Sequence, residues 1–269
     1  MHAIYNSSLC ARSQDFDLLL DVAQATGTGI EVCLYFQLPY VVAAQEAAYD
    51  RLMDTPITVH SPMEVDAASK PGTPEWEMLL EWWKRTFAIY QRLHARSVVM
   101  HTHQCGGFSS EEAERLRGYA LSNIRTIAQM AVEQGVKLTV ENVGLANNGS
   151  LLFNEEQYLQ LFDHLPKEVG ALIDLGHALI NRWDLERVVS SLGERIFSFH
   201  LHNNDGTADT HRPLFEEGSW LGPDQAEDFL RLTNRFCPDA EWILEYASGE
   251  HINREMLKAD LCRLQSINK

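Results

Sequence analysis

The sequence predicts a single (β/α)₈ barrel, an α/β fold in which each of eight parallel strands is followed by a helix. Short apolar runs rich in β-branched residues alternate with longer amphipathic runs, and eight such strand candidates occur. The length of 269 residues suits one barrel of about 250 residues. No linker interrupts the alternation, so we expect residues 1–269 to form one domain. A doubly wound open sheet is the alternative, but "YNSSLCARS" after the first strand is not a glycine-rich phosphate loop.

The elements follow in a regular order along the chain. The predicted strands are residues 2–7, 29–35, 56–61, 97–102, 137–142, 170–175, 196–202 and 241–246. The predicted helices are residues 15–26, 40–53, 73–95, 109–134, 154–165, 183–192 and 224–236, and a last helix from about residue 250. Thr73 before Pro74, and Ser110 before two glutamates, are typical helix-start residues.

Composition and charge exclude several classes of function. The chain has 38 acidic and 22 basic residues, a net charge of −16, and no clustered basic patch, so a nucleic-acid partner is not expected. No apolar run reaches the roughly 20 residues of a membrane span, and the first residues do not resemble a signal peptide. The five cysteines are odd in number and form no C-x-x-C pair, which indicates free thiols in a reducing compartment. We therefore expect a cytoplasmic protein without a membrane partner.

Titratable residues gather at the predicted strand ends, where barrel proteins build their active sites. Asp, Glu and His together make up 49 of the 269 residues, so chance would seldom place one of them at most strand ends. Six of the eight predicted strands carry such a residue among their last three positions: His60, His101, Glu141, Asp174, His200 and Glu245.

This mixture of side chains predicts a divalent metal site. Carboxylates together with neutral imidazoles suit Zn²⁺, Mn²⁺, Co²⁺ or Fe²⁺. Carboxylates that converge at a barrel mouth repel one another, and a cation removes that repulsion. In "LIDLGHALI", the spacing of Asp174 and His177 can put both side chains over the same mouth, although His177 could instead cap the next helix. Asn142, directly after Glu141, is expected to orient a carboxylate or bind substrate.

Other polar residues near the predicted mouth are given lesser roles. His103 and His202 lie two residues beyond a ligand candidate and are expected to support the site or to be exposed. Glu31 is expected only to line the pocket. Arg182 and Arg212 are the nearest basic residues, and thus the candidates for contacting a phosphate or carboxylate of the substrate.

The motifs, taken in order, resemble a known family. They are "VHSP", "VVMHTH", "LTVENVG", "LIDLGHA", "HLHNND…DTHRPLFEEG" and "ILEY", and they run from about His60 to Glu245. As a set they resemble the xylose isomerase-like TIM barrels, also called AP endonuclease family 2. That family includes endonuclease IV, ketose 3-epimerases, hydroxypyruvate isomerase and sugar-phosphate isomerases.

The resemblance implies two different sites. In the isomerase branch, one metal is held by residues that correspond to Glu141, Asp174, His200 and Glu245. There Glu141 and Glu245 are the catalytic base and acid, one on each face of the sugar, and His177 and Arg212 hold substrate oxygens. In endonuclease IV, Glu141 would join one ion, bound by His60 and His101, to a second ion in the central set. A third ion would be bound by His177, Asp209 and His211, and all nine positions carry a suitable ligand here.

Two functions follow as hypotheses. The first is a metal-dependent isomerase or epimerase of a small sugar, sugar phosphate or hydroxy-keto acid, which acts through a metal-stabilised enediolate. The alternative is an endonuclease IV-like phosphoesterase with a cluster of ions, so the cofactor is one to three divalent metal ions. A non-catalytic sugar-binding barrel would leave the paired glutamates without a role. The charge and the short stretch from residue 200 to 209 weigh against DNA repair and favour a carbohydrate-like substrate, while a homo-oligomer stays open.

Overall fold

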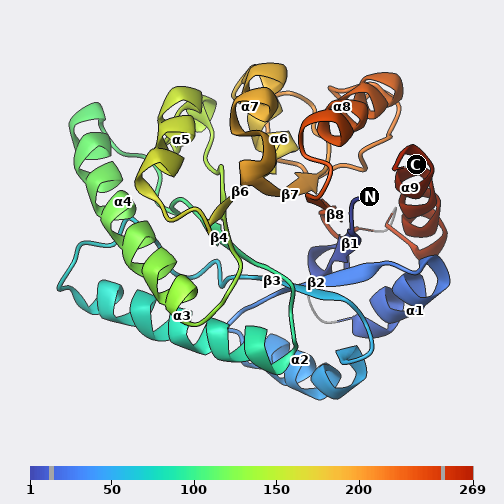
Figure 1. Ribbon diagram of the computed structural model, residues 1–269, viewed down its shortest axis with the longest axis horizontal. Coiled ribbons are helices and arrows are strands. Elements are labelled where there is room, and N and C mark those ends of the chain that lie inside the picture. The colour runs from blue at the N-terminus through green and yellow to red at the C-terminus, as the bar shows by residue number, and fades with distance from the viewer. Residues whose placement is uncertain (12–14, 250–251, 269) are drawn as a thin grey trace.

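The eight strands close into a parallel barrel in the computed structural model, which describes residues 1–11, 15–249 and 252–268 (Figure 1). Each strand pairs with the next along the chain, and the last pairs with the first. The fold class predicted from the sequence is therefore confirmed. The strands are β1 Ile4–Ser7, β2 Gly29–Cys33, β3 Ile57–His60, β4 Val98–His101, β5 Leu138–Glu141, β6 Gly170–Asp174, β7 Ile196–Leu201 and β8 Glu241–Leu244.

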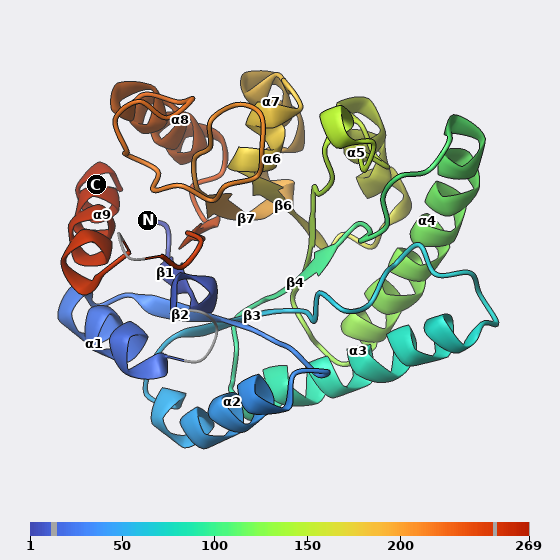
Figure 2. The same ribbon diagram turned by 180° about the vertical axis from the view of Figure 1, so that it is seen from behind.

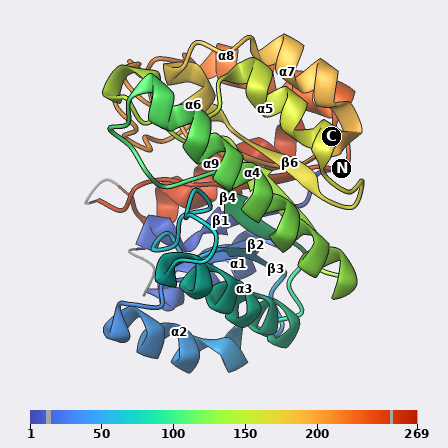
Figure 3. The ribbon, with the colours of Figure 1, turned by 90° about the vertical axis from the view of Figure 1, so that its left-hand side faces the viewer.

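The helices surround the barrel and cover its outer face. The side view shows α2 and α3 on one side of the strands and α7 and α8 on the other (Figure 3). The helices are α1 Phe16–Thr26, α2 Pro39–Leu52, α3 Pro74–Arg92, α4 Ser110–Glu133, α5 Glu155–Leu161, α6 Leu175–Ile180, α7 Leu185–Leu192, α8 Pro223–Phe236 and α9 Arg254–Ile267. The predicted start of the last helix, near residue 250, lies outside the described residues. None of the described helices has the length and apolar character needed to cross a membrane.

The helix starts follow the capping chemistry, with one correction. Thr73 caps α3, since its side chain accepts a hydrogen bond from the Trp76 amide. Helix α4 is capped by Ser109 and not by the predicted Ser110. Ser109 Oγ accepts from the Glu112 amide at 3.3 Å, and the Glu112 carboxylate accepts from the Ser109 amide at 2.9 Å. This reciprocal pair requires a glutamate three residues after the cap, and that spacing selects Ser109.

The end of β6 also differs from the sequence prediction. The strand stops at Asp174, and the short helix α6 begins at once with Leu175. Asp174 Oδ1 accepts a hydrogen bond from the His177 amide at 2.6 Å, so Asp174 is the cap and His177 lies in the first turn. Because the Asp174 side chain caps a helix, the chain turns into α6 at Leu175 and does not continue the strand. Both side chains are thereby held at the mouth of the barrel.

The segment between β7 and α8 covers part of this mouth (Figure 2, orange). Asn203 and Arg212 exchange two main-chain hydrogen bonds of 2.9 and 2.8 Å. This short antiparallel bridge holds together the two ends of the segment 204–211. The Asn147 side chain donates to the Thr207 carbonyl at 2.6 Å and joins this loop to the one after β5. The loop is therefore tied down where it carries Asp209 and His211.

Replacing Gly29 by Ala tests how tightly β1 and β2 are packed. An added Cβ would lie 2.3 Å from the Tyr5 ring and 2.5 Å from the Pro56 carbonyl oxygen. That oxygen already accepts a hydrogen bond from Ile30, so it has little freedom to move. We expect Gly29→Ala to lower the free energy of unfolding by about 1–3 kcal/mol, measured by urea denaturation.

The matched control for this substitution is Gly118→Ala in α4. A Cβ there meets nothing within 4 Å, so the change should raise stability by up to about 1 kcal/mol through helix propensity. Equal stability of Gly29→Ala and the parent protein would contradict the packing described here.

Candidate metal centre

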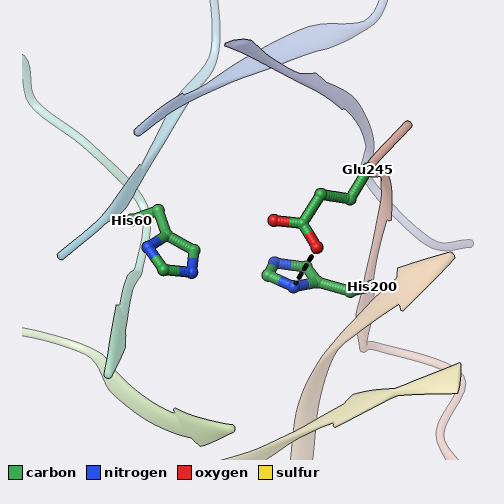
Figure 4. A group of neighbouring side chains, drawn as sticks. All are labelled: His60, His200 and Glu245. Carbon is green, nitrogen blue, oxygen red and sulfur yellow. Dashed lines mark ion pairs between the residues drawn. The ribbon is translucent and has the colours of Figure 1, made fainter. Parts of the chain in front are cut away.

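Side chains from several strands meet at the carboxyl end of the barrel. His60, His101, Glu141 and Asp174 are the last residues of β3, β4, β5 and β6. His200 is the penultimate residue of β7, and Glu245 directly follows β8. Figure 4 shows the side chains of His60, His200 and Glu245 pointing into the ring of strands. Apart from His101, which is partly exposed, these residues are buried, so their charges face one another with little water between them.

The first donor set consists of His60, His101 and Glu141. The Nε2 atoms of the two imidazole rings lie 3.0 Å apart. Glu141 Oε2 lies 3.4 Å from the first of these nitrogens and 3.3 Å from the second. This oxygen is buried and accepts no hydrogen bond within the described part of the chain. Two imidazole nitrogens and a carboxylate oxygen that point at one place suit a divalent cation.

The central set consists of Glu141, Asp174, His200 and Glu245. His200 Nδ1 lies 3.1 Å from Glu245 Oε2, 3.5 Å from Glu141 Oε1 and 3.9 Å from Asp174 Oδ2. This nitrogen, too, is buried and has no hydrogen-bond partner among the described residues. Glu141 presents Oε1 to the central set and Oε2 to the first set, so its carboxylate lies between them.

The third set consists of His177, Asp209 and His211. Asp209 Oδ2 lies 3.0 Å from His177 Nε2 and 3.1 Å from His211 Nε2. The backbone of His211 is in the left-handed region, with a φ of 43°. That conformation costs a residue other than glycine on the order of 1–3 kcal/mol and is concentrated at functional sites. The surrounding chain therefore holds His211 in a backbone conformation that this residue type disfavours.

The histidine rings are oriented for metal binding by their second nitrogens. His60 Nδ1 donates to the Ser61 carbonyl at 2.9 Å, His177 Nδ1 to the Asn142 carbonyl at 2.9 Å, and His211 Nδ1 to the Glu245 carbonyl at 2.8 Å. A carbonyl oxygen only accepts, so each Nδ1 carries the hydrogen. In the neutral ring, Nε2 then keeps the lone pair that a cation requires.

Asp174 is held by two residues outside the three sets described above, Asn142 and His202. The Asn142 side chain donates to the Asp174 carbonyl at 3.1 Å and accepts from the Asp174 amide at 2.7 Å. Both contacts are made with the main chain of Asp174, so the two predicted roles of Asn142 stay predictions. His202 lies 2.8 Å from Asp174 Oδ2 and stacks on His211, with ring centroids 3.8 Å apart. Gly176 makes room for it, since a Cβ there would lie 2.0 Å from the His202 ring.

A pocket of about 530 Å³ opens onto the three sets. His103, which is buried, lines it and contacts the Ser150 carbonyl at 2.7 Å. Among the described residues that line the pocket, none is Lys or Arg. Arg212 instead borders a separate hollow beside Glu216, so its predicted substrate contact stays a prediction. The pocket's apolar wall is formed by Leu9, Met63, Val143, Leu145 and Ala247.

When no cation is bound, the ionised carboxylates favour protonation of the neighbouring histidines. Burial opposes the ionisation of Glu141, but His101 and His200 hold its pKa well below the usual value. Burial likewise opposes the charging of His60, yet contact with Glu141 raises its pKa to about 9. The pKa of His211 is also about 9, because Asp209 and Glu245 outweigh the effect of burial. The donor groups thus fit a divalent ion that replaces these protons.

The protein is, by its fold and by this cluster, one of the (β/α)₈ barrels that gather carboxylates and histidines at the ends of their strands. The chain belongs to the xylose isomerase-like TIM barrel family, whose model matches residues 20–261. The resemblance seen in the sequence is therefore confirmed. No curated protein sequence matches the chain.

Solved structures show the same fold at low sequence identity. A D-tagatose 3-epimerase-like protein is 20% identical, with a TM-score of 0.76 over 99% of this chain and 98% of that one. The IolI protein with a bound zinc atom is 15% identical, with a TM-score of 0.77 over 99% and 98%. An AP endonuclease, family 2, from Brucella melitensis is 13% identical, with a TM-score of 0.70 over 99% of both chains. The similar structures thus include both carbohydrate epimerases and endonuclease-like proteins.

Metal binding should release protons and strengthen with pH. His60 and His211 are protonated below about pH 9, so a divalent ion at pH 7 must displace a proton from each. Raising the pH towards 9 removes this competition. We expect the apparent affinity of the first set to rise about tenfold per pH unit between pH 7 and 9. That of the third set should rise more steeply, because Asp174 and Asp209 also raise the pKa of His177.

Isothermal titration with Zn²⁺ in two buffers of different ionisation enthalpy measures both quantities. Identical heats in the two buffers at pH 7, with an affinity independent of pH, would contradict this account of the donor sets.

Proposed function

We propose that the protein is a hydrolase of small phosphate esters that uses a cluster of divalent ions. The observation that carries this proposal is the first donor set. His60 and His101 meet Glu141 Oε2 outside the central set, and this oxygen has no hydrogen bond within the described residues. An isomerase with one ion needs only the central set. A built second set favours a reaction that uses more than one cation.

Charge supports an anionic substrate. Ionised Glu141, Asp174, Asp209 and Glu245 together carry four negative charges in the three sets. Counted with the carboxylates alone, a single divalent ion leaves two negative charges, which protonated histidines have to balance. Three divalent ions make it positive, so a phosphate ester is attracted even though no Lys or Arg belongs to the described pocket lining. The number of ions therefore decides the charge of substrate that the pocket accepts.

The residues divide the work of the proposed reaction. Bound divalent ions would supply Lewis-acid polarisation of the phosphoryl group. Glu141 spans the first and central sets, while His177 and His211 hold Asp209 from two sides. Leu9, Met63 and Leu145 give the substrate's other half an apolar wall and exclude water from that side.

A small molecule is favoured over nucleic acid as the substrate. Phosphate-backbone binding depends on clustered basic residues, and this chain has a net charge of −16. The pocket lining supplies no basic side chain among the described residues that could follow a polymer backbone. A phosphorylated carbohydrate-like compound fits both the pocket volume of about 530 Å³ and the charge.

An isomerase or epimerase is the second candidate, favoured by the pair of glutamates. Glu141 from β5 and Glu245 after β8 lie 3.5 and 3.1 Å from His200 Nδ1, so two carboxylates reach the central set from different strands. With one ion in that set, they could serve as base and acid, a role worth roughly 10²–10⁴-fold in rate. The substrate would be a small sugar, sugar phosphate or hydroxy-keto acid.

Replacing His101 by Asn tests the cluster. The variant loses one of the two imidazole donors of the first set and should hold two ions per chain where the parent holds three, measured by elemental mass spectrometry after dialysis. We expect hydrolysis across a panel of sugar phosphates and nitrophenyl phosphates to fall about 10²-fold or more, since Lewis-acid stabilisation is worth several kcal/mol.

The matched control is His164→Asn, an exposed histidine away from the site, which should keep the parent's metal content and activity. One ion per chain in the parent, together with deuterium exchange from solvent into a ketose panel, would overturn the hydrolase proposal in favour of the isomerase. Loss of that exchange in Glu141→Gln and Glu245→Gln would then identify the acid–base pair.

A further inference from the structure

Glu31 is a buried carboxylate that the sequence predicted only to line the pocket. It lies in β2 with no exposed surface, two residues before the end of the strand, and it does not border the pocket. Its Oε2 lies 3.2 Å from His200 Nε2, and its Oε1 has no hydrogen bond among the described residues. Burial of a carboxylate is unfavourable unless it is paired, so this one contact with His200 has to account for its presence.

The two ends of the His200 ring face different partners. Nδ1 faces Glu245, Glu141 and Asp174 of the central set. Nε2 points away from that set, towards Glu31. A ring that gives its Nδ1 lone pair to a cation must carry its hydrogen on Nε2, and the Glu31 carboxylate is the acceptor for that hydrogen.

The other histidine rings of the three sets make different contacts through their second nitrogens. His60, His177 and His211 each donate Nδ1 to a main-chain carbonyl, which any residue type at the accepting position provides. His101 contacts the neutral Gln104 side chain. Among the five histidines of the three sets, His200 is the one whose second nitrogen meets a carboxylate that belongs to none of these sets. A carboxylate strengthens the ring as a donor more than a neutral acceptor does.

We propose that Glu31 is a positioning residue that fixes the His200 ring and raises the metal affinity of the central set. The inference rests on the metal centre of the proposed function but not on which reaction that centre performs. The contribution of Glu31 should therefore be visible in metal binding alone.

Glu241 provides a matched control inside the same barrel. It is also a buried carboxylate, but it lies at the start of β8, at the other end of the barrel. There it accepts hydrogen bonds from Ser97 at 2.6 Å and Ser198 at 3.1 Å, and pairs with Lys137 at 3.3 Å. The same Glu→Gln change can thus be made once beside His200 and once away from it.

The experiment measures Co²⁺ binding to the full chain in a background that carries His101→Ala and His211→Ala. These changes remove one donor from each outer set and leave the central set complete. Glu31→Gln, Glu31→Leu and Glu241→Gln are compared by Co²⁺ titration and by the visible absorption of the bound ion, with circular dichroism as the check on folding.

We expect Glu31→Gln to weaken Co²⁺ binding about 10- to 100-fold and to shift the absorption bands. Glu31→Leu should weaken it further, because no acceptor for Nε2–H is left. Glu241→Gln should keep the affinity within about threefold of the background. Should Glu31→Leu not fold, the Co²⁺ affinity of the nearly isosteric Glu31→Gln is sufficient to test the inference.

Two results would overturn the inference: Co²⁺ binding and spectrum of Glu31→Gln equal to those of Glu241→Gln, or a background protein that binds no Co²⁺. A weakened central set in Glu31→Gln supports the inference whether or not the parent protein hydrolyses phosphate esters. A failure of the proposed hydrolase function can therefore be distinguished from a failure of the role proposed for Glu31.

Discussion

The repulsion among buried carboxylates at the barrel mouth is the constraint on which the rest of the site depends. Glu141, Asp174 and Glu245 all approach His200 Nδ1 within 3.9 Å from three different strands. Like charges at such distances in a water-poor interior require positive charge between them. Protonated histidines can supply that charge when no metal is present, and divalent ions can replace the protons. The same histidines could thus bind the ions or, when protonated, replace their charge.

The surrounding structure orients the histidines and leaves their metal-facing nitrogens accessible. Main-chain carbonyls take the hydrogens of three rings, and the carboxylate of Glu31 faces the fourth, His200. Gly176 admits the His202 ring beside Asp174, where a larger residue would collide with it. The loop that carries His211 is closed by main-chain hydrogen bonds and keeps this residue at a φ of 43°. The backbone preference of His211 is overridden at this mouth, as often happens at a functional site.

The barrel and the residues at its strand ends were predictable because they follow from local patterns. Alternating apolar and amphipathic runs indicate strands and helices, and parallel strands bring their ends to one edge. Glu31 and His202 were not assigned their contacts, since each of them meets a residue of another strand. Glu31 in β2 meets His200 in β7, and these strands are not neighbours, while His202 meets Asp174 at the end of β6. Such contacts depend on the geometry of the closed barrel, and one sequence contains no record of it. The early end of β6 was missed because it depends on the Asp174 cap, which competes with the strand's apolar pattern.

The chemistry of the centre depends on how many ions it holds, because the same side chains serve both candidate reactions. With one ion, Glu141 and Glu245 would remain partly free as bases, which suits proton transfer on a neutral sugar. With three ions, the same carboxylates are neutralised and lose their basicity, while the centre becomes able to attract a phosphate. His60 and His101 decide between these states, since they provide the donors that the central set does not need. If the proposed cluster holds, a barrel that lost this pair of imidazoles would keep its fold and lose the donors for a further ion.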